Sequence, residues 1–241
     1  MTTASKSRGE GSASSRRTRE ALILAGEQLF GAQGIDSVSL RQINTAAGQR
    51  NSSAAHYHFG SKEALVGAVV EFRMERVNNR RLARLRQLEA TGRTHEIRAI
   101  VETVIYPIMD EIREGDGGSH YIRFMAQVVG HPQISLTAIW NSPFGTGLSQ
   151  VIEHLRVALP DLPSPILGQR FGLMWEQAIH AMADRERLSA GEPGSQLIAR
   201  DVFVSNLVDT VAGGLSAPVS QATRAALEQA DKHSKRYGQG D

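Results

Sequence analysis

The chain has 241 residues, of which 41% are hydrophobic and 22% charged, so it is long and apolar enough to bury a core. It contains no cysteine, which excludes disulfides, thiol nucleophiles and zinc sites built on thiolates. It also lacks both an uninterrupted run of roughly 18 apolar residues and an apolar N-terminal signal, so a cytoplasmic protein without a membrane span is expected.

The net charge of +2 conceals an uneven distribution. Residues 1–90 contain 14 Lys and Arg against 8 Asp and Glu, whereas the remaining residues contain 13 against 17. A basic front half joined to an acidic rear half favours contact of the front half alone with a polyanion. Because helix faces are often arginine-rich for solubility alone, charge by itself does not decide between nucleic acid and solvent.

The first residues, 1–15, have almost no bulky apolar side chains, and we expect them to form a disordered, weakly basic arm. The pattern then becomes helical. Leu22, Ala25 and Leu29 recur at the spacing of one helix face, and Gly31 and Gly34 are expected to stop this helix.

Two short helices are predicted next. Ser39, followed three residues later by Gln42, fits a capping box at the start of the first helix, which Gly48 ends. The second helix is predicted from about Asn51, as its N-cap, to Phe59.

Ser61 then caps a much longer helix of about 28 residues. Neither short helix would be stable alone, because isolated helices below about a dozen residues are marginal in water. Both must therefore pack on the long helices that flank them. This arrangement predicts a helix-turn-helix at about residues 39–59.

Residues 16–70 resemble the DNA-binding domain of the TetR family of bacterial transcriptional regulators. The resemblance rests on a Phe-x-x-x-Gly helix end (Phe30 and Gly34), on the "AAG" turn that ends at Gly48, and on "HFGSKEAL" at the start of the long helix. Between this turn and "YHF" the family usually has one residue fewer, which we interpret as an enlarged turn at Gln49–Asn51. The extra residue leaves open which of the following side chains read bases.

A recognition helix in the major groove needs small side chains towards its partner helix and hydrogen-bonding side chains of varied reach towards DNA. Ala54 and Ala55 meet the first need, and the polar residues before them meet the second. The family resemblance implies that His56, Tyr57 and Lys62 hold phosphates. The predicted DNA-binding residues are Ser39, Arg41, Gln49, Arg50, Asn51, Ser52, Ser53, His56, Tyr57 and Lys62.

Other interpretations of these segments are less favourable. His56 and His58 lie two apart on a short helix and point in divergent directions, so no metal site is predicted. The arginines between residues 80 and 86 are interpreted as a solvated helix face. No nucleophile elbow, zinc-protease motif or carboxylate constellation is present, so no enzyme activity and no cofactor are predicted.

From residue 94 onward the pattern is helical throughout, with no alternating strand pattern. The expected helical segments are roughly 94–113, 118–130, 132–158, 164–188 and 195–213. The predicted fold is all-α, a three-helix helix-turn-helix DNA-binding domain followed by a larger helical ligand-binding and dimerisation domain. The expected divisions are an arm at 1–15, the DNA-binding domain at 16–76, the C-terminal domain at 77–217 and a polar tail at 218–241.

The last two long segments carry apolar stripes. The family commonly dimerises through a four-helix bundle made from such helices, and the resemblance therefore implies a homodimer. The predicted interface residues are Leu167, Phe171, Ala178, Met182, Phe203, Leu207 and Val211. The alternative is that both stripes face the core of their own subunit, as helix stripes usually do.

The middle segments are rich in aromatic and methionine side chains and carry few charges, which favours a pocket for a small, largely apolar organic effector. The predicted lining residues are Tyr106, Met109, His120, Arg123, Phe124, Met125, Trp140, Phe144, Met174 and Trp175. The alternative for each of these residues taken singly is that it belongs to the hydrophobic core and lines no pocket.

Taken together, these features predict a homodimeric transcriptional regulator that a small molecule releases from a palindromic operator in double-stranded DNA. Two alternatives stay open at this point. One is a DNA-binding regulator without an effector, and the other is a helical enzyme.

Overall fold

The structure is a computed structural model that describes residues 4–112, 120–132, 134, 145–191 and 197–237. The secondary structure of these residues is helical, which confirms the predicted all-α fold. The helices are α1 (Ala4–Gln33), α2 (Leu40–Ala46), α3 (Ala54–Phe59), α4 (Lys62–Ala90), α5 (Ile97–Met109), α6 (Tyr121–Val129), α8 (Thr146–Ala158), α9 (Ser164–Gly191), α10 (Arg200–Ser216) and α11 (Gln221–Tyr237).

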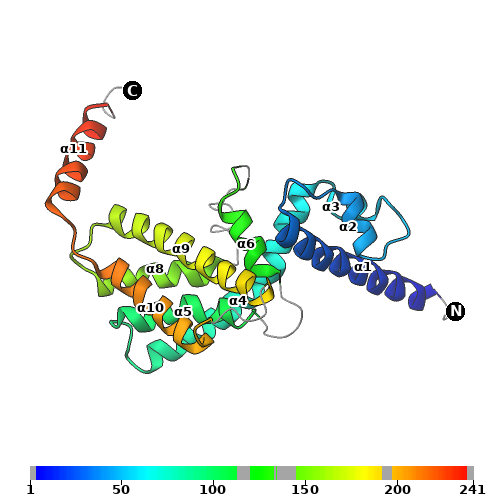
Figure 1. Cartoon of the computed structure of the whole chain (residues 1–241), viewed down its shortest axis with the longest axis horizontal. Helices are drawn as coiled ribbons and strands as arrows, with labels where there is room; N and C mark the ends of the chain where they lie inside the picture. The colour runs from blue at the N-terminus through cyan, green and yellow to red at the C-terminus, as the bar shows by residue number, and fades with distance from the viewer. Residues whose placement is uncertain (1–3, 113–119, 133, 135–144, 192–196, 238–241) are drawn as a thin grey trace.

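At one end of the molecule, α1, α2 and α3 pack around the first part of α4 (Figure 1). The core of this unit consists of apolar residues that are fully shielded from solvent, among them Phe30, Ile43, Ala55 and Leu65. The two short helices are thus held by the long ones, as their length requires.

The remaining helices form a larger lobe (Figure 1). In this lobe α5 packs against α4, α8 and α10, while α6 lies against both α1 and α9. The rings of Phe30 and Phe124 stack with centroids 6.0 Å apart, which joins α1 to α6. The helix α4 runs unbroken across the boundary predicted between residues 76 and 77, so the two parts of the molecule share it.

A buried ion-pair network also connects the two parts. Arg73 on α4 contacts Glu27 on α1 through Nε and Oε2 at 2.5 Å, and it contacts Glu111, just after α5, at 3.2 Å. Arg80 approaches the same Glu111 carboxylate at 2.6 Å. The carboxylates are nearly inaccessible to solvent, so these contacts are weakly screened.

Three expectations about segments need correction. The residues expected to form a disordered arm continue α1 back to Ala4, because propagating a packed helix is cheap and residues 4–15 contain no proline. The helix expected over 132–158 is described only as α8, and residues 135–144 lie outside the described residues. The polar tail contains the helix α11, which projects from the lobe (Figure 1).

In the described part of the chain no single helix is long and apolar enough to cross a membrane. Only the pair Arg200–Ser216 and Gln221–Ala230 reaches that length and composition together, and it is bent by 59°.

Candidate functional site

The predicted capping box at the start of α2 is confirmed. The backbone N–H of Gln42 donates to Ser39 Oγ at 3.3 Å, and the backbone N–H of Ser39 donates to Gln42 Oε1 at 2.8 Å. The helix ends before Gly48, whose φ of 67° lies in the left-handed region that favours glycine. The cap predicted at Ser61 is confirmed as well, because its side chain accepts from the Ala64 N–H.

The start of the second short helix was predicted too early. The helix α3 begins at Ala54, with Ser53 as N-cap, and Asn51 lies in the preceding turn. There the Asn51 side chain accepts the Ser53 N–H at 2.9 Å, which closes a local turn instead of capping a helix. Residues 50–53 are therefore presented by a turn, and only the following residues are presented by α3.

A buried amide on α2, Asn44, positions α3. Its Oδ1 accepts the Ala55 N–H at 2.8 Å, and its Nδ2 donates to the Ser52 carbonyl at 2.6 Å. Asn44 is only 2% exposed, so both bonds form away from solvent. Asn44 is not among the residues predicted from the sequence. The available signal was its spacing from Leu40 and Ala47, which places it on the inner face of α2.

Most of the predicted DNA-contacting side chains are exposed. Gln49 is half-buried, and its Nε2 donates to the Ala47 carbonyl at 3.0 Å. Tyr57 is 82% exposed, which is unusual for an aromatic residue, and its ring meets His58 edge-on. The exposed members are Ser39, Arg41, Arg50, Asn51, Ser52, Ser53, His56 and Tyr57.

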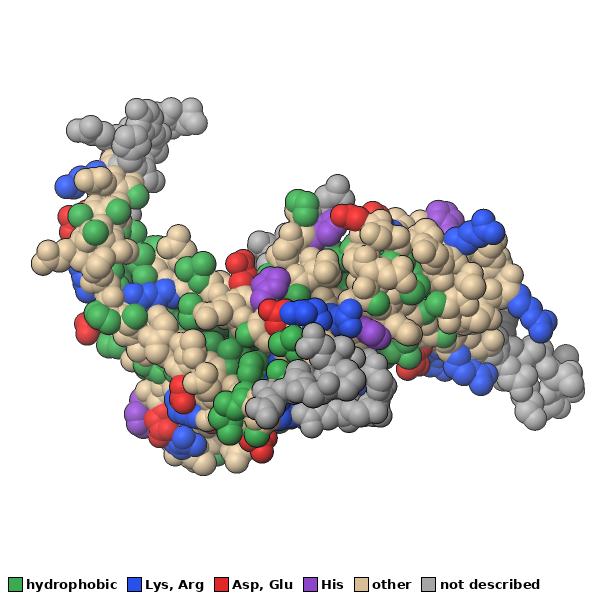
Figure 2. Space-filling view, in the orientation of Figure 1, with side chains coloured by type: hydrophobic (Ala, Val, Ile, Leu, Met, Phe, Trp, Pro, Cys, Tyr) green, Lys and Arg blue, Asp and Glu red, His purple; other side chains and the backbone are tan. Residues whose placement is uncertain are grey.

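Lys62 is already engaged in the fold. Its Nζ donates to the carbonyls of Ile35 at 3.1 Å and Asp36 at 3.3 Å, in the connection that follows α1. Its charge still lies at the start of α4, next to the end of α3. In Figure 2, Lys and Arg side chains stand out on the end of the molecule formed by α1, α2 and α3. The exposed residues predicted to contact DNA therefore lie at the end of the molecule where basic side chains stand out.

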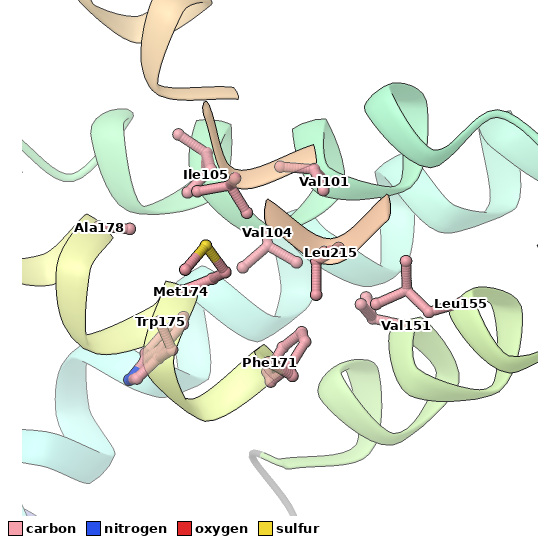
Figure 3. Close-up of a pocket in the computed structure, with 11 residues that line it drawn as sticks. Val101, Val104, Ile105, Val151, Leu155, Phe171, Met174, Trp175, Ala178 and Leu215 are labelled. Carbon is pink, nitrogen blue, oxygen red and sulfur yellow. The ribbon is translucent and has the colours of Figure 1, made fainter. Parts of the chain in front are cut away.

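The larger lobe contains a small apolar cavity between α5, α8, α9 and α10 (Figure 3). Its free volume is about 20 Å³, which is room for about one water molecule. The indole of Trp175 lies at its edge, and every lining side chain is apolar or aromatic. The lining residues are Val101, Val104, Ile105, Val151, Leu155, Phe171, Met174, Trp175, Ala178, Val211 and Leu215.

The residues predicted to line a pocket do not gather there. Only Met174 and Trp175 line this cavity, and Trp140 and Phe144 lie outside the described residues. Arg123 instead lines an open groove between α1, α6 and α9. Met109, Phe124 and Met125 are buried core residues, Tyr106 is half-buried under Arg84, and His120 is half-buried beside the end of α1.

The stripe predicted to form the dimer interface is part of the subunit's own core. Leu167, Ala178 and Met182 are each 1% exposed within a single subunit, and Leu207 and Val211 are also buried. Phe171 lines the cavity, and Phe203 is half-buried under Arg185. An apolar stripe shows that a helix face is covered, but not whether its own subunit or a second one covers it, and here the subunit itself covers most of these side chains.

The arginines of α4 are not all solvated, contrary to expectation. Arg80 pairs with Glu111, Arg84 pairs with Asp110 at 3.4 Å, and Arg86 is exposed. Arg81 is fully buried. Among the described residues, no group of three or more His, Asp or Glu side chains is placed to hold a metal ion.

Comparisons with known proteins agree with this arrangement. The family described as "Bacterial regulatory proteins, tetR family" matches residues 22–69, and "Tetracyclin repressor-like, C-terminal domain" matches residues 102–214, together more than half of the chain. No curated protein is significantly similar.

One similar solved structure is assigned as a TetR-family transcriptional regulator from Mesorhizobium loti MAFF303099. It is 16% identical, with 84% of this chain and 96% of that chain covered and a TM-score of 0.45. The two family matches cover the helix-turn-helix and most of the lobe that holds the cavity. The chain therefore belongs to the TetR family of bacterial transcriptional regulators, which bind DNA and are not enzymes.

Proposed function

We propose that this regulator is a homodimeric repressor that binds a palindromic operator and is released from it by a small organic effector with a largely apolar body. The observation that carries the proposal is the course of α4. Its first turn lies beside α3, and its later turns pack on α5 and α8, two of the helices that enclose the cavity. A single rigid element thus connects the DNA-reading end to the cavity.

The dimer contact is assigned to the outward faces of α9 and α10, in place of the buried stripe. These two helices pack against each other and expose Leu173 and Val202, which are 59% and 50% accessible. Around Gly168 and Gly172, on the same helix as Leu173, open space would let a second backbone approach closely. Exposed apolar groups beside small residues favour helix-to-helix contact.

This assignment can be tested with charge substitutions. Leu173→Glu and Val202→Glu should give monomers in light scattering that keep their helical circular dichroism and lose operator binding. The matched control is Val157→Glu on α8, where the side chain is 69% exposed and lies outside the proposed contact. If both variants remain dimeric, then the dimer contact lies on another surface.

Release would operate through the spacing of the two recognition helices. A dimer must meet half-sites about 34–36 Å apart, so a small shift of α4 changes its fit to the operator. The cavity, at about 20 Å³, must widen to accept an organic molecule, and that widening displaces the helices around it. An effector acts only if it binds the widened state better than the DNA-bound state.

A second function is favoured by the same small volume. A regulator without an effector needs no cavity larger than this one, and a subunit with room for one water is compatible with that role. One measurement distinguishes the two functions. If the regulator responds to an effector, some compound will both raise its melting temperature and weaken its binding to the operator. A regulator without an effector will show no such compound.

The test of DNA binding is selection of duplexes from random sequence by the purified full-length protein. We expect enrichment of a palindrome and a steep decrease of affinity with salt, because phosphate contacts release counterions. Equal binding of all duplexes would contradict specific regulation.

A further inference from the structure

Arg81 lies on the inner face of α4. It follows Met74 by seven residues and Val77 by four, and it precedes Leu85 by four, which is the spacing of one helix face. These three neighbours are buried, and Arg81 itself is 0% exposed. A guanidinium therefore occupies a position at which the rest of the helix face carries apolar side chains.

This buried guanidinium has no hydrogen-bond partner within the described structure, because Nε and both Nη atoms are unpaired. Two other arginines of α4 have carboxylate partners. Arg73 pairs with Glu27 and Glu111, and Arg80 pairs with Glu111. Burial lowers the pKa of Arg81 to about 10, so it remains protonated at neutral pH. An unpaired buried charge is costly, which makes a missing anionic partner the natural explanation.

A second feature at the same place also favours an anion. The start of α8 packs on the Arg81 side chain, and a Cβ added to Gly147 would lie 3.0 Å from Arg81 Cδ and 2.6 Å from Asn78 Oδ1. The Asn78 amide fixes this approach, because its Oδ1 accepts the Gly147 N–H at 3.0 Å and its Nδ2 donates to Thr146 Oγ1 at 3.1 Å. The positive end of the α8 dipole therefore lies beside the guanidinium.

The same face of α8 leads to the apolar cavity. Val151 and Leu155 line the cavity and follow Gly147 at intervals of four residues, each about 6 Å along the helix axis. A molecule with an anionic group at Arg81 would thus have its remaining atoms directed towards an apolar space about one to two helical turns away.

We propose that the effector is an amphipathic organic acid whose carboxylate pairs with Arg81 and whose apolar body enters the cavity beside Val151 and Leu155. The planar guanidinium can bind a carboxylate through two parallel hydrogen bonds. The inference rests on the proposed effector-responsive function and specifies its chemistry. Because Arg81 is on α4, neutralising its charge acts on the helix that carries the DNA-reading end.

The experiment compares acids with their neutral counterparts on the full-length protein. The probes are sodium octanoate and 4-phenylbutyrate, each paired with its carboxamide, and binding is measured by calorimetry and by melting temperature. Wild-type protein should bind the acids roughly 10- to 100-fold more tightly than the amides, the range that charge-assisted hydrogen bonds span. Arg81→Met should remove this preference, whereas the control Arg86→Met, at an exposed position of the same helix, should keep it.

A second readout is the stability of the ligand-free protein. Arg81→Met should raise the melting temperature, because an apolar side chain of similar length replaces an unpaired buried charge. If Arg81→Met does not fold, Arg81→Gln carries the same comparison of acid and amide. The inference is overturned if acids and amides bind wild-type protein equally, if no acid binds, or if the uncharged variants keep the preference for acids.

These outcomes are separate from a failure of the proposed function. Operator selection without any ligand tests DNA binding alone. A protein that binds its operator but prefers neutral compounds would retain the repressor function and lose the assignment of Arg81. A protein that binds acids through Arg81 without selecting any operator would retain the assignment of Arg81 and lose the repressor function.

Discussion

The helix-turn-helix and the cavity-bearing lobe differ in how completely their buried polar groups are hydrogen-bonded, because the lobe holds unpaired groups beside paired ones such as Asn78. In the helix-turn-helix, Asn44 is buried with both amide atoms bonded to the backbone of the turn and α3. In the lobe, Arg81 and the carboxylate of Glu186 are buried without hydrogen-bond partners among the described residues. A satisfied polar group holds one geometry, whereas an unsatisfied one leaves free energy for a ligand or a proton to release. The difference teaches that, among the described residues, the buried charged groups with unused hydrogen-bonding capacity lie in the lobe and not in the helix-turn-helix.

The junction between the two regions should show the largest effect. Glu27→Gln removes a carboxylate that is 4% exposed and pairs with Arg73, and it should lower the free energy of unfolding by about 3–5 kcal/mol. Denaturant unfolding measures this loss. Glu20→Gln, at an exposed position of the same helix, is the control and should be nearly neutral. A small loss for Glu27→Gln would show that the Glu27–Arg73 pair contributes little to the stability of this junction.

The rigidity of the reading end can be broken at Asn44. Asn44→Ala leaves the Ala55 N–H and the Ser52 carbonyl without their partner, so operator binding should weaken by about 2–4 kcal/mol, with a parallel loss of stability. Gel-shift titration and thermal unfolding give the two quantities. The exposed neighbour Thr45, changed to Ala, should leave operator affinity close to wild type. Unchanged affinity of the Asn44 variant would mean that DNA itself orders α3.

The exposed residues predicted to contact DNA should separate base reading from phosphate contact. Arg50→Ala or Asn51→Ala should reduce operator affinity by about 1–3 kcal/mol and relax the preference at individual base pairs. Tyr57→Phe should weaken all sequences more evenly. Selection of binding sites with each variant measures both effects. If the selected site is the same for Arg50→Ala and Asn51→Ala as for wild type, then the turn does not read bases.

The unpaired, largely buried carboxylate of Glu186 predicts that stability depends on pH. Burial raises the pKa of its carboxyl to about 7 from an ordinary value of 4.5. The folded protein therefore binds this proton more tightly than the unfolded chain, and stability should fall as the pH rises from about 4.5 through about 7.

Glu186→Gln should remove this dependence and raise the free energy of unfolding at pH 8 by about 1–2 kcal/mol, after allowance for partial solvent screening. Thermal unfolding between pH 5 and pH 8 measures it. Glu176→Gln, at an exposed site of α9, should keep the wild-type slope. If the stability of the Glu186 variant changes with pH as steeply as that of wild type, then Glu186 is not the source of the pH dependence.

What the sequence by itself determined is where α2 begins and ends and where α4 begins. The spacing of Ser39 and Gln42, the glycine at position 48 and the cap at Ser61 act over three or four residues, so their geometry follows from neighbouring side chains. The periodic apolar positions likewise determined an all-helical chain, because burial of one helix face needs no knowledge of what covers it.

Only the tertiary structure decided which surface covers each face and which polar groups are buried. The stripe from Leu167 to Met182 turned inwards, Asn44 became a buried anchor, and Arg81 was placed in the core although its neighbours Arg80 and Arg86 were not. The physical reason is that burial and pairing depend on residues distant in sequence, such as Gly147 beside Arg81, and periodicity along one helix carries no information about them.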